Sequence, residues 1–133
     1  DGGQSSKEEL ALRDFYKRLL NFTISSEALM GEYQDIHQYN RDKTLNYNSK
    51  ILSFVRWSEN EKLIIVSNFD ANESHEFELK IPTEIIKKWD LKNGKFRLND
   101  KLYNQANFDL QVNDSGKIAL KIKPLESFIL KLQ

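Results

Sequence analysis

The sequence predicts a mainly β fold, an antiparallel β-sandwich preceded by one amphipathic N-terminal α-helix. Three observations lead to this prediction. Apolar and polar residues alternate through most of the second half of the chain, a run near the N-terminus has the helical period, and turn-forming pairs separate the alternating runs. A length of 133 residues suits one domain with a single core. We expect residues 1–30 to form the helix and an exit segment, and residues 31–133 to form the sandwich.

The helix is predicted from its capping pattern and its apolar face. Ser5 and Ser6 are each followed three residues later by a glutamate, which is the spacing of a capping box. At 100° per residue, six large apolar side chains fall within an arc of about 160°. They are Leu12, Phe15, Tyr16, Leu19, Leu20 and Phe22. We expect the helix to end near Phe22 or Thr23.

Four alternating runs predict strands that are buried on one face only. They are centred on Leu79, Leu110, Leu120 and Leu130. Turns are expected at Asn93-Gly94, at Asn99-Asp100 and across residues 113–116. The stretch Pro82–Trp89 is ambiguous, because a proline followed by this sequence is compatible with either a short helix or a strand.

Two further runs, Ile51–Trp57 and Leu63–Phe69, are apolar at successive positions. Such strands are typically covered on both faces. One cover is the opposing sheet. The other is the N-terminal helix, a connecting loop, or polypeptide that this chain does not include.

Composition excludes several classes of function. The chain has 20 basic and 20 acidic residues, so it lacks the basic excess typical of a nucleic-acid binder. It has no cysteine, which excludes disulfides and zinc–thiolate sites. No apolar run approaches the roughly 20 residues that span a bilayer. The polar N-terminus, residues 1–7, resembles neither a signal peptide nor an anchor, and the absence of an initial methionine suggests a processed or excised chain.

The apolar face of the helix is wide for a small sandwich. Six such side chains contribute about 10 kcal/mol when buried, which is comparable to the net stability of a small domain. Two interpretations are open. Either the helix packs wholly onto the sandwich, or part of its face meets another domain. An isolated chain would then fold the helix back or self-associate through Phe15, Leu19 and their apolar neighbours.

Several motifs, in order, resemble the C-terminal region of the α-amylase family of glycoside hydrolases. The run 12–20, read LRDFYKRLL, and then Ala28-Leu29-Met30-Gly31 resemble the last barrel helix and its exit. ILSFVR at 51–56, LIIVSNF at 63–69 and LKIKPLESFIL at 120–130 resemble three strands of the all-β domain that follows. Thr23 and Ile24 depart from the family, which has an arginine and a basic partner there. The insertion at 82–89 is longer than a hairpin connection needs.

The resemblance implies that residues 1–30 are the last helix and exit segment of a β/α barrel. It also implies that residues 31–133 are a non-catalytic domain that buttresses that barrel. The family's three catalytic acids lie on earlier barrel strands, and their signatures are absent. The barrel of the same parent chain is therefore the expected partner, through an interface that uses Leu12, Phe15, Tyr16, Leu19 and Leu20. The parent enzyme would act on starch or other α-1,4-glucans outside the cytoplasm of a bacterium, with a cytoplasmic location left open.

We expect no catalytic residue, cofactor or metal site in this chain. His37 and His75 are the only histidines and lack zinc-ligand spacing. Asp70, Asn72 and Glu73 are predicted to form a solvated turn, since they lack a calcium-loop pattern. The alternative function is α-glucan binding through surface aromatics, with Tyr47, Trp57, Trp89 and Tyr103 as candidates. The two tryptophans are more typical of core or interface positions than of a sugar platform, whereas Tyr47 and Tyr103, flanked by asparagines, are expected at the surface.

Overall fold

The computed structural model describes residues 3–103 and 106–133, without the side chains at 3–5, 8, 11, 19, 20 and 22–25 of the first helix. Eight strands form one continuous sheet in the order β1-β2-β3-β8-β5-β6-β7-β4, and each neighbouring pair is antiparallel. The elements in chain order are α1 (Gly3–Ser25), the 3₁₀ helix η1 (Ala28–Met30), β1 (Glu32–Asp35), α2 (His37–Lys43), β2 (Ile51–Trp57), β3 (Lys62–Asn68), β4 (His75–Ile81), α3 (Thr83–Lys88), β5 (Gly94–Asp100), β6 (Asn107–Asn113), β7 (Ser115–Ile122) and β8 (Ser127–Leu132).

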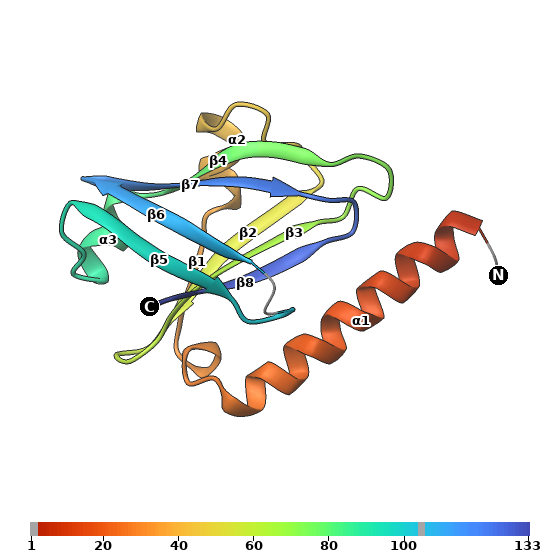
Figure 1. Cartoon of the computed structure of the whole chain (residues 1–133), viewed down its shortest axis with the longest axis horizontal. Helices are drawn as coiled ribbons and strands as arrows, with labels where there is room; N and C mark the ends of the chain where they lie inside the picture. Colours follow the sequence, from red (N-terminus) through yellow and green to blue (C-terminus); the bar gives the residue numbers. More distant parts are fainter. Residues whose placement is uncertain (1–2, 104–105) are drawn as a thin grey trace.

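The sheet curls so that β1-β2-β3-β8 faces β5-β6-β7-β4, which gives the predicted sandwich (Figure 1). The two layers are joined where β8 pairs with the end of β5. Between them lies the inner core, formed by alternate residues of the strands. Its buried members include Ile51, Val55, Ile64, Val66, Phe77, Leu79, Leu98, Leu110, Ile118, Leu120, Phe128 and Leu130.

A second set of buried residues lies on the opposite face of β3 and β8. This outer cluster consists of Ala28, Leu63, Ile65, Leu102 and Ile129, with Phe15, Leu29, Phe54 and Tyr103 packed against it. The prediction of a doubly covered strand is therefore confirmed for β3. Strand β2 is covered less completely, because Leu52 on its outer face is 40% exposed. Strand β8 was expected to be buried on one face, but Ile129 is fully buried in the outer cluster.

The ambiguous stretch after Pro82 is a helix. The carbonyl of Pro82 accepts hydrogen bonds from the N–H groups of Ile85 and Ile86, which start α3. Ile85, Ile86 and Trp89 are buried in the inner core. A proline can precede such a turn without loss of a helical hydrogen bond, because the first N–H groups of a helix have no intrahelical partner.

Two local predictions are wrong, and one helix was not predicted. Helix α1 begins at Gly3, before the predicted cap, and ends at Ser25. Asn99 and Asp100 are the last residues of β5 rather than a turn, since Asp100 is buried and its carboxylate accepts backbone N–H groups from Leu102, Tyr103 and Ile129. Helix α2 was not predicted, because residues 37–43 carry no apolar period and the element is stabilised by tertiary contacts.

Helix α1 is long and lies mostly apart from the sandwich, which it approaches at η1 (Figure 1). Among the described residues, no helix has the length and apolar character required to span a membrane.

Ile64 and Ile65 test the two buried regions as a matched pair, because they are neighbours on β3 that face opposite sides. Truncation of either to alanine should lower the free energy of unfolding by about 2–5 kcal/mol, as measured by urea denaturation. A loss below about 1 kcal/mol for Ile65→Ala alone would show that the outer cluster is not packed like a core.

Candidate functional site

The segment between α1 and β1 is anchored to the sandwich by Glu61, a buried carboxylate that precedes β3. Its Oε1 accepts hydrogen bonds from Ser26 Oγ at 2.6 Å and from the Ala28 N–H at 2.9 Å. Its Oε2 lies 3.1 Å from Lys131 Nζ. Burial alone would raise the pKa of Glu61, but these hydrogen bonds and the Lys131 charge outweigh it and hold the pKa below its ordinary value.

Arg56 holds the next part of the same segment. Its Nη2 donates to the carbonyl oxygens of Leu29 at 2.8 Å and Gly31 at 3.1 Å. Gly31 also passes close to β2, since a Cβ atom there would lie 2.2 Å from the carbonyl oxygen of Trp57. The exit segment is thus fastened on both sides of η1, and the C-terminal end of α1 has a defined position on the sandwich.

Helix α1 touches its own domain along one margin. Tyr103 donates a hydrogen bond to Asp14 at 3.1 Å, and Arg18 Nη1 donates to the Leu102 carbonyl at 3.3 Å. The Arg18 guanidinium lies 4.3 Å from the centre of the Tyr103 ring, and Phe15 packs against the outer cluster. Burial, with the hydrogen bond to Asp14, raises the pKa of Tyr103.

The residues that were predicted to face the barrel differ in their burial. Phe15 is partly buried against the outer cluster, whereas Leu12 is 38% and Tyr16 is 58% exposed. The side chains of Leu19 and Leu20 lie outside the described residues. Helical geometry puts Asp14, Phe15 and Arg18 within an arc of about 100°, with Leu12 and Tyr16 beyond its Phe15 edge. The described contacts between α1 and the sandwich therefore involve only one edge of the apolar arc. Leu12 and Tyr16, nearer the middle of the arc, are exposed.

Apolar side chains are also exposed on the outer face of the β1-β2-β3 layer. Tyr33 is 57% exposed, and Leu52 and Phe69 are each 40% exposed. Tyr33 packs on Phe54, with ring centres 5.4 Å apart. Since Phe54 packs against the outer cluster, these residues continue the apolar surface beyond the contact with α1.

The four aromatic candidates for sugar binding do not share a surface. Tyr47, expected at the surface, is buried in the inner core, where its hydroxyl lies 2.8 Å from Ser53 Oγ and burial raises its pKa to about 12. Trp89 is also buried, and Trp57 packs edge-on against it. Tyr103 is partly exposed but has Arg18 on its ring. The surface position predicted for Tyr47 is therefore wrong, because the β2 and β4 side chains enclose it.

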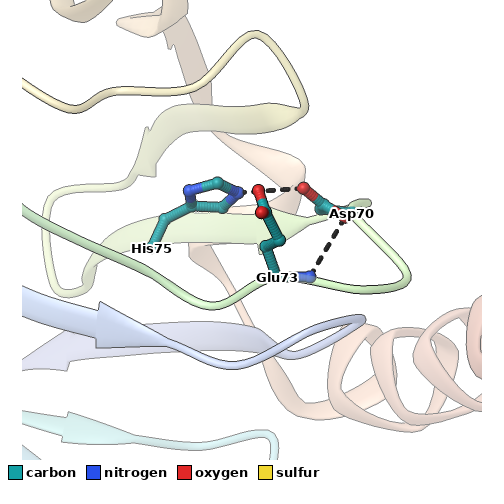
Figure 2. Close-up of side chains that lie close together, drawn as sticks. All are labelled: Asp70, Glu73 and His75. Carbon is teal, nitrogen blue, oxygen red and sulfur yellow. Dashed lines mark hydrogen bonds and ion pairs between the residues drawn. The ribbon is translucent and has the colours of Figure 1, made fainter.

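A polar cluster occupies the connection between β3 and β4, where potential ligand atoms of Asp70, Glu73 and His75 lie within 4.8 Å of one another (Figure 2). Asp70 Oδ1 accepts the N–H groups of Asn72 and Glu73, and its Oδ2 lies 3.1 Å from His75 Nε2. The hydrogen bond from the Asn72 N–H lowers the pKa of Asp70, and the contact with His75 lowers it further. Together they outweigh burial, which raises the pKa, and hold it below its ordinary value.

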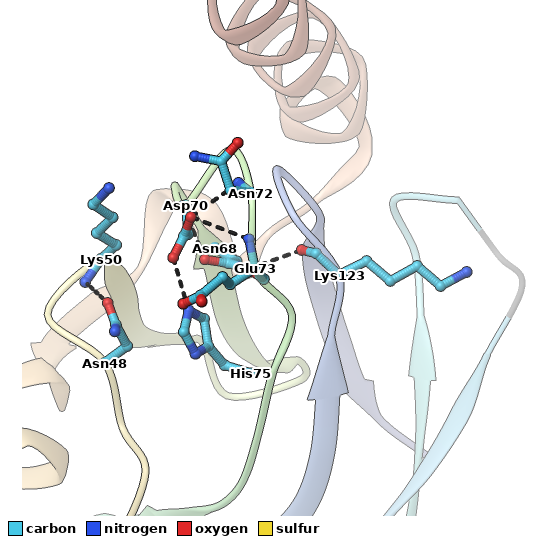
Figure 3. Close-up of polar contacts among 8 residues, drawn as sticks. All are labelled: Asn48, Lys50, Asn68, Asp70, Asn72, Glu73, His75 and Lys123. Atoms are coloured by element: carbon cyan, nitrogen blue, oxygen red, sulfur yellow. Dashed lines mark hydrogen bonds and ion pairs between the residues drawn. The ribbon is translucent and has the colours of Figure 1, made fainter. Parts of the chain in front are cut away.

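Asn68 extends the cluster to the connection between β7 and β8 by donating from Nδ2 to the carbonyls of Glu73 and Lys123, each at 3.0 Å (Figure 3). Both Asp70 oxygens are occupied by protein groups. The turn predicted at 70–73 is present, but Asp70 is buried instead of solvated. These contacts hold the connection between β3 and β4 in place.

Replacement of Glu61 by glutamine tests the anchor. At neutral pH the E61Q variant should be less stable than the native chain by about 1–3 kcal/mol, since it loses charge-assisted bonds. The folded-state pKa is lowered, so the contribution of Glu61 is present above the ordinary value of 4.5 and is lost as the pH falls through the folded pKa.

The stability difference between the two proteins should therefore narrow when urea unfolding is repeated at about pH 4 and below. A constant difference across that range would contradict the role assigned to the charge.

A comparison with protein-family models agrees with this fold. Residues 42–133, more than half of the chain, match the family model described as alpha amylase, C-terminal all-beta domain. A search of curated proteins finds no match. Among solved structures, a GH27 β-L-arabinopyranosidase from Geobacillus stearothermophilus in complex with arabinose aligns with a TM-score of 0.43 and 13% identity. The alignment covers 65% of this chain and 18% of that protein. The antiparallel sandwich and the family match together show that this chain belongs to the family of alpha-amylase C-terminal all-β domains.

Proposed function

We propose that this chain is the non-catalytic C-terminal part of an α-amylase-like enzyme acting on starch or related α-glucans, and that it buttresses the catalytic β/α barrel. The observation that carries the proposal is the combination of a firmly anchored exit segment with two exposed residues, Leu12 and Tyr16, on the apolar arc of α1. A helix that belonged only to the sandwich would turn the middle of its apolar face toward it.

The anchor supports a mechanical role. Glu61 and Arg56 fix the point at which α1 joins the sandwich, so a partner bound to α1 would also be held at a defined position relative to the sheet. Pre-positioning of this kind lowers the entropic cost of docking two domains.

The composition of the surface supports a protein partner. Leu12 and Tyr16 on α1, together with Tyr33, Leu52 and Phe69 on the sheet, are large apolar side chains exposed to water. Apolar and aromatic side chains of this type are typical of the centre of an interface. A β/α barrel is the partner that the family supplies, and α1 would be the last helix of its outer ring.

The burial of the aromatic candidates favours buttressing over sugar binding. Stacking on a pyranose requires an exposed aromatic face, and Tyr47 and Trp89 present none. Trp57 and Tyr103 are partly exposed, but each has a neighbouring cation on its ring, Lys88 and Arg18 respectively. These contacts leave little open ring surface for a glucan.

A binding experiment tests the interface. The double variant Leu12→Ser/Tyr16→Ser should bind the barrel expressed from the same gene about ten- to a hundredfold more weakly than the native chain, because it removes two apolar contacts. Isothermal titration calorimetry measures the change. The matched control is Arg13→Ser/Lys17→Ser on the polar side of α1, which should change the affinity by less than about threefold. Equal loss in both variants, or no barrel encoded upstream, would refute the proposal.

Titration with maltoheptaose separates the two functions. We expect the chain alone to give no saturable heat, because the four aromatic candidates, Tyr47, Trp57, Trp89 and Tyr103, form no shared open platform. Saturable binding that Tyr103→Ala or Trp57→Ala abolishes, with the fold retained by circular dichroism, would establish a carbohydrate-binding module instead.

A further inference from the structure

Strand β4 is an edge strand of the sheet and pairs with one neighbour, β7. Backbone groups in an antiparallel strand point alternately toward and away from its partner. The N–H and C=O of Lys80 both bond to Asn40, so they point away from β7. By the alternation along the strand, the backbone groups of Glu76 and Glu78 also point away from β7, and we call these the outward groups of β4. Such an edge is a template for strand addition.

Asn40 of α2 occupies one end of this edge. Its Nδ2 donates to the Lys80 carbonyl at 3.0 Å, and the Lys80 N–H donates to its Oδ1 at 2.8 Å. These are the two bonds that a residue of a neighbouring strand would make. Asn40 is fully buried and is held by bonds from its Nδ2 to the Ile36 carbonyl at 2.9 Å and from Thr44 Oγ1 at 2.6 Å.

The rest of the edge is open. A groove of about 500 Å³ borders it, and its lining includes Thr44, Leu45 and Asn46, Glu76 and Glu78 of β4, and Ala119 and Lys121 of the neighbouring β7. Among the described residues, no hydrogen bond reaches the outward backbone groups of Glu76 or Glu78. Space and unpaired donors are therefore present for a second strand.

Charge decides which strand-to-strand registers two copies can use. A symmetric pairing centred on residue 78 sets Lys80 opposite Glu76 twice and Glu78 opposite Glu78 once, so that opposite-charge pairs outnumber like-charge pairs. A pairing centred on residue 79 sets Lys80 opposite Glu78 twice. Both need the backbone groups of Lys80, which Asn40 occupies. A pairing centred on residue 77 uses only Glu76 and Glu78 and sets these glutamates opposite each other twice, which is unfavourable.

We propose that Asn40 is an edge stop, which prevents β4 from pairing with β4 of a second copy of this chain in the registers that charge favours. The proposal is independent of the enzyme to which the chain belongs. It explains why an asparagine is fully buried in a short helix, with its amide directed at a strand edge.

Sedimentation velocity of matched variants tests the edge stop. Asn40→Ala should self-associate at least about tenfold more strongly than the native chain. Adding Lys80→Glu should abolish that gain, because both favourable registers then place glutamates opposite each other. Adding Glu76→Lys to this double variant should restore the stronger self-association, because position 76 then carries the positive charge and position 80 the negative charge. A folded Asn40→Ala variant with native association, or association indifferent to the charge changes, would overturn the proposal.

Hydrogen exchange of the native chain gives a test that does not depend on folding of the variant. The Lys80 amide should exchange at least about tenfold more slowly than the amides of Glu76 and Glu78 on the same edge. Equal exchange at the three positions would show that Asn40 does not close the edge.

Discussion

The position of α1 depends on one buried carboxylate. Glu61 joins Ser26 and Ala28 in the exit segment to Lys131 on β8, and so connects residues that are far apart in the chain. A buried charge without such partners would be costly, and here hydrogen bonds and a cation satisfy it. Arg56 and Gly31 then hold the next turn, so the helix meets the sandwich at one fixed place.

That fixed place explains the unequal burial of α1. Asp14, Phe15 and Arg18 face the loop held by the Asp100 carboxylate, whereas Leu12 and Tyr16 remain exposed. Apolar residues are also exposed on the outer face of the sheet, next to Phe54 of the outer cluster. Buttressing of a barrel, the function proposed above, would account for this distribution.

Polar side chains bond to backbone groups that the pairing of the strands leaves without a partner. Asp70, Asn68 and His75 hold the connection between β3 and β4 in place, and Asn40 bonds to the edge of β4. In each case a side chain satisfies backbone groups that regular pairing leaves unmet, which buried polar groups require. The sandwich thus relies on a few buried polar residues for its boundaries and on its apolar residues for its interior.

Periodicity and turn chemistry in the sequence were sufficient to predict the helix, the sandwich and the double burial of β3, because these depend on neighbours within a few residues. The family was predicted from the order and spacing of motifs such as ILSFVR at 51–56 and LIIVSNF at 63–69. The tertiary structure alone decided the burial of Tyr47, the strand position of Asp100, helix α2, and the roles of Glu61 and Asn40. Glu61 bonds to residues 33 or more positions away, and Asn40 to Lys80. No local pattern encodes such partners, since they meet only when the sheet has formed.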